Sequence, residues 1–273
     1  MPRPHVSSGS PRTSTRRAPG SWRRPAPSSR TPEAGSVERP RPALRTDPGE
    51  VWRVGRAPDP WGWTDWRYAE RGRFPGRWDS PDGSYRTIYA GSTPHACLVE
   101  LIAPFRPDPS VADDLAAIVE DEADAALHPT VAPGRLDDSW FGARRLGRAV
   151  LTGTYCDVTH SSTVAALRPR FLDQARQAGL ADLDVAALQD ARPRQLTQAI
   201  GRALYEETED GRAVVDGIRF PSRHGRDLEL WAVFERASDV GRSGRLTEAT
   251  VQALDADHPA VRSAAALHGV RIG

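Results

Sequence analysis

From residue 50 onwards, segments that favour strands and segments that favour helices follow one another without a regular β-α-β alternation. Alternating apolar and β-branched side chains predict strands at 51–54, at 86–90, within 146–158, at 214–220 and at 228–234. Apolar residues three and four apart predict helices at 93–102, 110–127, 161–178, 184–189 and 193–208, with two short helices within 247–268. This order predicts a single α+β domain over residues 49–273.

The first 48 residues differ sharply in composition from the rest of the chain. They contain ten prolines and one aromatic residue, too little apolar surface to offset the entropy of ordering. Residues 1–45 carry ten Arg and two Glu, a net charge of +8, so the total of +1 leaves −7 for residues 46–273. We therefore expect 1–48 to be a disordered tail. Its charge could bind nucleic acid, but a solvated extension is the simpler interpretation because no aromatic or Gly–Arg repeat accompanies the charge.

Several classes of protein are excluded by what the sequence lacks. It contains no P-loop, zinc-protease motif, nucleophile elbow or dinucleotide fingerprint, and its seven His show no pairing four residues apart. Cys97 and Cys156 are isolated, which argues against a disulfide framework and a structural zinc site. We expect no metal. With no export signal and no apolar run of the roughly 18–20 residues that a membrane span needs, we expect a cytoplasmic protein.

One acidic residue stands on a helix where packing does not explain it. Thr93 and Pro94 form a typical helix start, with Thr93 as the N-cap and Pro94 at the first helical position. The apolar stripe that follows does not include Glu100; it consists of Cys97, Leu98, Leu101 and Ile102. By itself, a carboxylate in this position would indicate only a solvated helix face.

The order of Arg, Tyr, Glu and Ser residues resembles that of the RES domain, a family named after its Arg, Glu and Ser. Residues 51–54 are similar to its opening strand, and the core of the domain is similar to 76–79, 88–90 and 96–100. The serine segment corresponds to 217–223 and 231–234, so the resemblance covers roughly 50–236 and implies that the core of the domain lies there. Two departures stand out. Glu100 and Ser222 lie 122 positions apart, with extra helices expected between them, and Phe220 stands where tyrosine is common.

The resemblance implies an ADP-ribosyltransferase-like fold and a bacterial toxin that degrades NAD+ by phosphorolysis or hydrolysis. NAD+ is then a substrate rather than a cofactor, and inorganic phosphate is the co-substrate of phosphorolysis. The implied partner is a cognate antitoxin with an Xre-type helix-turn-helix region, so no direct nucleic-acid binding is expected from the folded domain of the toxin. The implied catalytic residues are Glu100 and Arg77, and the residues that bind NAD+ are Arg53, Arg77, Tyr89 and Ser222.

The chemistry of NAD+ cleavage agrees with these residue types. Loss of nicotinamide generates an oxocarbenium-like ribosyl cation, which a carboxylate such as Glu100 can stabilise. The guanidinium groups of Arg53 and Arg77 match phosphate oxygens bidentately. Tyr89 could stack on the nicotinamide or bond the ribose, and Ser222 could hold the nicotinamide amide or a phosphate. Since nicotinamide leaves as a neutral molecule, no strong general acid is required.

Each of these residues also has an ordinary structural interpretation. Arg77 could form a surface cation–π pair with Trp78, Tyr89 could fill the core, and Ser222 could be a turn residue. His224, directly after the serine segment, could approach the pocket. The loop before Arg77 carries tryptophans that could form a lid, a partner surface or a small separate core, namely Trp61, Trp63 and Trp66.

We therefore expect a toxin that cleaves the nicotinamide–ribose bond of NAD+, either as a phosphorylase or as a glycohydrolase. Phosphate is the favoured acceptor, because an Arg-rich pocket can hold a second anion. A first alternative is an enzyme that transfers ADP-ribose to a host protein with the same residues. A second, from a different class, is a nucleic-acid-binding module that uses the basic tail. The second alternative, like an inert scaffold, leaves the Arg, Tyr, Glu and Ser set unexplained.

Overall fold

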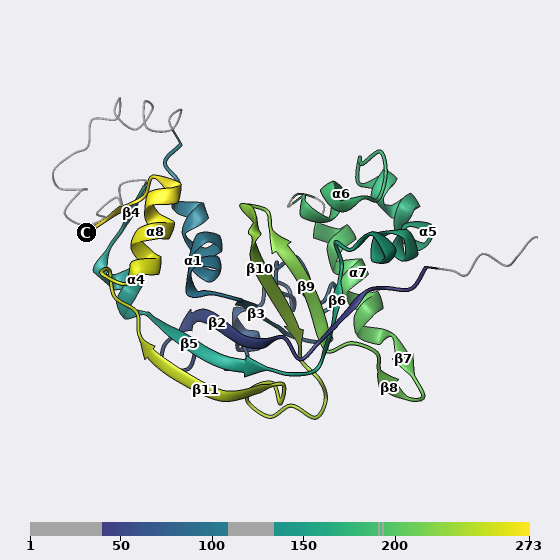
Figure 1. The fold of residues 1–273 in the computed structure, drawn as a ribbon, viewed down its shortest axis with the longest axis horizontal. Coiled ribbons are helices and arrows are strands. Elements are labelled where there is room, and N and C mark those ends of the chain that lie inside the picture. Colours follow the sequence, from purple (N-terminus) through teal and green to yellow (C-terminus); the bar gives the residue numbers. More distant parts are fainter. Residues whose placement is uncertain (1–39, 109–133, 191, 193) are drawn as a thin grey trace, which may run out of the picture. The chain divides into compact units, whose positions relative to one another are not determined.

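An eight-stranded mixed sheet runs through the computed structural model, which describes residues 40–108, 134–190, 192 and 194–273 (Figure 1). The strand order is β1-β6-β9-β10-β3-β2-β5-β11. The strands are β1 (Leu44–Thr46), β2 (Gly49–Arg56), β3 (Thr87–Gly91), β5 (Arg144–Leu151), β6 (Thr154–Asp157), β9 (Gly217–Ser222), β10 (Gly225–Phe234) and β11 (Leu246–Ala253). Neighbouring strands are antiparallel except β6 and β9, which are parallel.

Two groups of helices accompany this sheet (Figure 1). The helices are α1 (Pro94–Ile102), α4 (Asp138–Gly142), α5 (Ser161–Gln177), α6 (Val185–Gln189), α7 (Arg194–Glu206) and α8 (Pro259–His268), with 3-10 turns at Trp66–Tyr68 and Ala103–Phe105. Two small ribbons pair β4 (Arg135–Leu136) with β12 (Arg271–Ile272) and β7 (Thr208–Glu209) with β8 (Arg212–Ala213). α1 packs against α8, and α5 packs against α7. The predicted α+β class is confirmed.

Strand β10 buries side chains on both of its faces. Leu230 and Ala232 belong to a hydrophobic cluster that also contains the inner faces of α1, α5, α7 and α8. Trp231 and Val233, which alternate with them, belong to a second cluster on the opposite face. Because successive side chains of a strand point to opposite faces, the continuous apolar stretch at 230–234 must be covered on both sides. This double burial fixes the β9–β10 hairpin, which carries the serine segment.

The connection from β3 to α1 requires a small residue and a good helix start. A Cβ at Gly91 would lie 2.9 Å from Cys97 Sγ and 3.1 Å from the Ala96 Cβ, so only glycine fits where the strand meets the helix. Thr93 Oγ1 accepts a hydrogen bond from Ala96 N at 3.1 Å, and Pro94 occupies the first helical position. The predicted N-cap is confirmed, and it sets the direction in which α1 presents its side chains.

Most of the predicted elements lie where the sequence placed them. Residues 51–54 lie within β2, and 86–90 overlaps β3. The region 146–158 holds two strands, β5 and β6, and the helices expected at 161–178, 184–189 and 193–208 correspond to α5, α6 and α7. The segment between Glu100 and Ser222 therefore holds helices as expected. The acidic helix predicted at 110–127 lies outside the described residues.

The predicted boundary of the tail at residue 48 is wrong. β1, at Leu44–Thr46, pairs with β6 at the edge of the sheet. Just before it, Ala43 N donates a hydrogen bond to Thr163 Oγ1 at 2.8 Å. All three β1 side chains are exposed, so the strand is held by backbone pairing and leaves no hydrophobic pattern in the sequence. The folded part therefore includes residues before 49, at least from Ala43, where the first hydrogen bond to α5 forms.

The prediction of two short helices within 247–268 is also wrong in its first half. Leu246–Ala253 forms strand β11, which pairs with β5 at the other edge of the sheet, and only α8 is helical. The segment contains Leu, Glu and Ala, which favour helices, but Thr247, Thr250 and Val251 are β-branched and fit a pleated edge. Pairing with β5 therefore overrides the local preference, and the core extends beyond residue 236.

Candidate functional site

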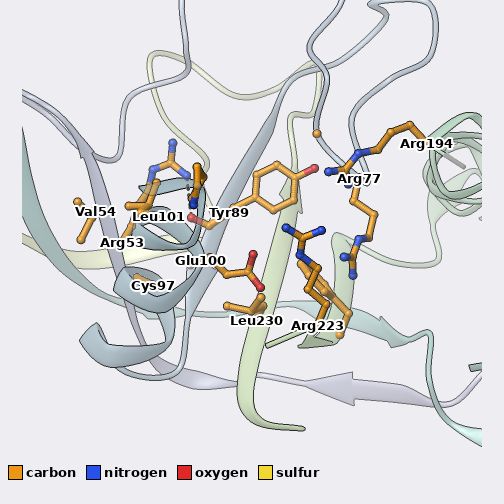
Figure 2. Close-up of a pocket in the computed structure, with 14 residues that line it drawn as sticks. Arg53, Val54, Arg77, Tyr89, Cys97, Glu100, Leu101, Arg194, Arg223 and Leu230 are labelled. Carbon is orange, nitrogen blue, oxygen red and sulfur yellow. Dashed lines mark hydrogen bonds between the residues drawn. The ribbon is translucent and has the colours of Figure 1, made fainter. Parts of the chain in front are cut away.

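A cavity of about 450 Å³ is lined by residues of β2, β3, α1, the β9–β10 hairpin and the start of α7 (Figure 2). Four of the five residues singled out in the sequence line it, namely Arg53, Arg77, Tyr89 and Glu100. The fifth, Ser222, is only 1% exposed and hydrogen-bonds to Glu100. The structure therefore brings all five predicted residues together, although they come from distant parts of the chain.

A tight turn at 76–79 positions Arg77. Asp79 Oδ2 accepts a hydrogen bond from Gly76 N at 2.6 Å, and a Cβ at residue 76 would overlap both this carboxylate and the Tyr89 hydroxyl. Trp78 is fully buried beneath the turn, and its backbone N–H donates to Tyr89 Oη at 2.9 Å. The turn is thus tied to β3, so Arg77 projects from a rigid support.

Tyr89 contributes its ring rather than its hydroxyl to the cavity. The hydroxyl accepts the hydrogen bond from Trp78 N and donates to Asp79 Oδ1 at 3.0 Å. Burial raises the pKa of Tyr89 well above its usual range, and the nearby Asp79 carboxylate adds to this rise. Burial also raises the pKa of Asp79, while the hydrogen bonds from Tyr89 and Gly76 oppose the shift. The Tyr89 hydroxyl and the Asp79 carboxylate therefore hold the turn at 76–79 in place.

Arg77 is buried, with 8% of its surface exposed. Its Nη2 donates to Gln189 O at 3.4 Å, and its guanidinium lies 5.7 Å from the centre of the Phe220 ring. The interpretation of Arg77 as half of a surface pair with Trp78 is therefore wrong. Burial lowers the pKa of Arg77 and the charge of Glu100 raises it, while two further arginines lower it.

Arg53 is fixed by backbone carbonyls. Its Nε donates to Pro60 O at 2.6 Å, and its Nη1 donates to Tyr89 O at 2.7 Å. Burial is the main cause that lowers the pKa of Arg53. A guanidinium has five N–H donors, so these two bonds hold the side chain in place and leave donors for a ligand.

Glu100 and Ser222 form a short hydrogen bond. Ser222 Oγ donates to Glu100 Oε1 at 2.5 Å and accepts from His224 N at 2.9 Å. Because the backbone N–H occupies a lone pair of the hydroxyl, the hydroxyl hydrogen is directed at the carboxylate. The contact that the structure assigns to Ser222 is therefore with Glu100. The serine fixes one carboxylate oxygen and leaves the other without a hydrogen bond from the described residues.

Two histidines connect this pair to α8. The His224 ring lies 5.5 Å from the ring of His268 in an edge-on arrangement. Since His268 Nδ1 accepts from Arg106 Nε at 2.6 Å, its Nε2 carries the proton and donates to Val99 O at 2.8 Å. Burial lowers the pKa of His224, and the charge of Glu100 opposes this shift. His224 therefore contacts Ser222 without lining the cavity, and His268 anchors the Val99 carbonyl, which precedes Glu100.

Two arginines in the cavity were not singled out from the sequence. Arg194, the first residue of α7, and Arg223, in the β9–β10 turn, both line it. Figure 2 shows their guanidinium groups gathered with that of Arg77, with Arg53 drawn at the other side. Arg223 directly follows Ser222 and could have been found from the serine segment. Arg194 lies in the long segment before it, and no local pattern points to it.

The cavity concentrates positive charge in an otherwise acidic domain. Arg53, Arg77, Arg194 and Arg223 face one carboxylate, Glu100, and within the described ranges none of the four forms an ion pair. Arg77 is buried, Arg53 and Arg194 are partly buried and Arg223 is exposed. Removing a cation from water without a counter-ion is costly, so a bound anion offsets that cost most at Arg77. The arrangement therefore suits a ligand that carries negative groups and that presents an electron-deficient centre to Glu100.

The thiol that lines the cavity is protonated at neutral pH. Cys97 lines the cavity, but its Sγ contacts Trp52 O at 2.9 Å and burial raises its pKa to about 12, so it is not a thiolate at neutral pH. In the parts of the chain that the structure describes, no three His, Cys, Asp or Glu side chains gather as a metal site.

None of the described helices is both long enough and apolar enough to span a membrane.

Two tryptophans of the loop before Arg77 pack onto the main sheet. Trp61 is fully buried and Trp63 is 9% exposed, and both belong to the second hydrophobic cluster. Trp66 is 38% exposed and packs on Phe74 with ring centres 5.4 Å apart. The interpretation as a small separate core is therefore wrong for the first two tryptophans, because they share the second cluster with strand residues such as Ile88 and Trp231.

Comparisons with known proteins gave one family match. The model of the RES domain matches residues 50–257 of this chain. Among solved structures, a chain of the crystal structure of the M. tuberculosis MbcT–MbcA toxin–antitoxin complex is similar, with a TM-score of 0.39 and 17% sequence identity. That match covers 82% of this chain and 92% of the other. A search of curated proteins found no match.

Proposed function

Because the chain belongs to the RES domain family, we propose that it is the toxin of a toxin–antitoxin pair and cleaves the nicotinamide–ribose bond of NAD+. The observation that supports this proposal most is the position of Glu100 among four arginines that form no ion pair within the described residues. NAD+ offers two phosphates to the guanidinium groups. It also offers a ribose carbon, C1″, that becomes cationic when nicotinamide leaves.

The proposed reaction begins with loss of nicotinamide. The bond between C1″ and the nicotinamide nitrogen breaks, and both electrons go to the nitrogen, so nicotinamide leaves neutral. Glu100 stabilises the positive charge that develops on the ribose, and the hydrogen bond from Ser222 holds the carboxylate in place. A fixed charge in a site that excludes water stabilises more than the same charge in solution. The enzyme therefore acts mainly through positioning and electrostatics.

Phosphate is the acceptor that we favour over water. An oxygen of phosphate already carries negative charge, so its electron pair can form the new bond to C1″ without a base. Water must lose a proton in the same step. Arg194 and Arg223 add two guanidinium groups to those of Arg53 and Arg77, which supplies enough positive charge for a second anion. The product is then ADP-ribose 1″-phosphate.

The test is a product analysis with purified protein and NAD+. We expect free nicotinamide, measured by chromatography, to depend on inorganic phosphate, and a new phosphomonoester signal in the phosphorus NMR spectrum. ADP-ribose as the product, formed equally without phosphate, would identify water as the acceptor. ADP-ribose attached to a protein would identify a transferase. Absence of nicotinamide under all conditions would contradict the proposal.

The charge of the cavity also suggests how the proposed antitoxin acts. We propose a partner with an Xre-type helix-turn-helix region that places a chain end or an acidic segment in the cavity. Its carboxylate then pairs with an arginine in place of an NAD+ phosphate. Raising NAD+ should weaken the apparent affinity of the antitoxin in a calorimetric titration. Independent binding of both would rule out this mode of inhibition but not the pairing of the two proteins.

A further inference from the structure

A second cavity adjoins the first. It measures about 400 Å³ and shares Arg53, Val54 and Leu101 with the cavity that holds Glu100. Each cavity lies near the lower end of the range of roughly 300–1,000 Å³ that is typical of small-molecule sites. NAD+ consists of two nucleotides joined through their phosphates. Two adjoining cavities of similar size, with an arginine at their junction, match that division.

The second cavity is bordered by two arginines that face each other across neighbouring strands. Arg56, the last residue of β2, is the register partner of Arg144, the first residue of β5. Side chains at directly opposed positions lie about 4.5–5.5 Å apart at their Cβ atoms, and like charges there are destabilising. Burial lowers the pKa of Arg144, and the charge of Arg56 lowers it further. The fold thus tolerates a repulsive pair at the rim of a cavity.

Neither arginine has a counter-ion among the residues that the structure describes. Arg144 donates only to Trp140 O, at 2.9 Å, and lies 4.2 Å from the Trp140 ring centre. Arg56 lies 5.3 Å from the ring centre of Tyr68, which is half exposed. Arg67, by contrast, already has Asp65 as a partner at 3.7 Å. The pair therefore presents two guanidinium groups without a carboxylate partner, near a half-exposed ring that Arg67 also contacts at 4.8 Å.

We infer that the second cavity binds the adenosine-phosphate half of NAD+, with a phosphate held between Arg56 and Arg144. This inference rests on the proposed function of the first cavity. A phosphate between the two guanidinium groups removes their repulsion and accepts charge-assisted hydrogen bonds from both. Tyr68 is half exposed, so its ring can contact the base. Arg53 then lies where the two halves of the dinucleotide meet.

The test compares two substrates that share the reacting bond. Nicotinamide mononucleotide has the same nicotinamide–ribose bond as NAD+ but lacks the adenosine half. We expect Arg56→Gln to raise the KM for NAD+ about tenfold, the usual scale for one charge-assisted bond, and to leave the KM for the mononucleotide unchanged. Arg144→Gln should give the same split. Equal effects on both substrates, or none on either, would overturn the inference.

A matched control lies on the same strand. Arg145 neighbours Arg144 but lines neither cavity, and its guanidinium donates to Gly142 O and Arg144 O. Arg145→Gln should therefore leave both KM values unchanged. The KM for inorganic phosphate should not change in the Arg56 variant. Suppose instead that Arg56→Gln changes the KM for inorganic phosphate and affects NAD+ and the mononucleotide equally. Arg56 and Arg144 would then bind the acceptor phosphate, and the inference would be overturned.

A binding measurement separates failure of this inference from failure of the proposed function. Adenosine monophosphate should raise the unfolding temperature of the wild-type protein and raise it less in Arg56→Gln. Without ligand, Arg56→Gln should unfold no lower than the wild type, since it removes a like-charge pair. If the protein releases no nicotinamide from NAD+, the proposed function fails. The shift in unfolding temperature with adenosine monophosphate then decides by itself whether the second cavity binds an adenosine phosphate. Equal stabilisation of both proteins would overturn the inference.

Discussion

Replacing Ser222 by Ala tests how the carboxylate of Glu100 is held. The change removes a hydroxyl that is 1% exposed and donates to Glu100 Oε1 at 2.5 Å. A hydrogen bond to a charged group contributes about 1.5–3 kcal/mol. If that energy fixes the carboxylate for the transition state, kcat should fall about 10- to 100-fold, at about 1.4 kcal/mol per factor of ten. The KM for NAD+ should change little, because Ser222 does not line the cavity.

The assay is steady-state release of nicotinamide, with the unfolding temperature measured in parallel. Ser222→Ala should also lower stability by about 1–3 kcal/mol, because the backbone N–H of His224 loses its acceptor. Ser243→Ala is the matched control. Ser243 is equally buried and accepts from Arg245 N at 3.2 Å, but it lies outside the cavity. A folded Ser222→Ala variant with kcat within about twofold of the wild type would refute the reasoning.

Three further predictions follow from other parts of the fold. Arg77→Lys keeps the charge but loses the bidentate geometry, so the KM for NAD+ should rise about tenfold in steady-state kinetics; an unchanged KM would contradict this. Removal of residues 1–39 should leave the unfolding temperature unchanged in calorimetry, whereas removal of 1–48 should lower it, because it deletes β1 and its pairing with β6; equal effects would disprove the revised boundary. Burial lowers the pKa of His224, so the unfolded chain binds more protons as pH falls through about 6.5 and stability decreases toward acid. The unfolding temperature of His224→Gln should fall less between about pH 7.5 and 5.5, and an identical profile would show that this group does not contribute.

The sequence predicted elements best where buried side chains or a helix cap leave a local pattern in the chain. The second half of β10 is apolar and buried on both faces, and the predicted strand at 228–234 lies within it. α1 was found from Thr93, Pro94 and its apolar stripe, because helix starts have local chemical requirements. In both cases the information lies in residues close together in the chain.

The two edge strands were missed for a shared physical reason. β1 has only exposed side chains, and seven of the eight residues in β11 are at least partly exposed. An edge strand of this kind is held by backbone hydrogen bonds to a neighbour that is far away in the sequence. The β1 residues were assigned to the tail from composition and the β11 residues to a helix from the spacing of apolar residues. Neither criterion includes the neighbouring strand that decides the outcome.

The candidate site shows the same division between local and distant information. Five residues were found through their resemblance to a family, and the structure brings them together. Arg194 could not be found, because it reaches the cavity only through the packing of a helix in the long segment before Ser222. The contact between Ser222 and Glu100 spans 122 positions, so the role of the serine as a support for the carboxylate emerged only from the fold.

The most direct test of the proposed function is nicotinamide release by the wild-type protein and by Glu100→Gln. The variant keeps the shape of the side chain and removes its charge. If Glu100 stabilises the ribosyl cation, the wild type should release nicotinamide from NAD+ and the variant should be about 10²- to 10³-fold slower, the scale of a lost electrostatic stabiliser. Binding of NAD+, measured by calorimetry on the variant, should change far less. A folded variant that binds NAD+ and turns it over at the wild-type rate would contradict the assignment of Glu100, and a wild-type protein that releases no nicotinamide would contradict NAD+ cleavage itself.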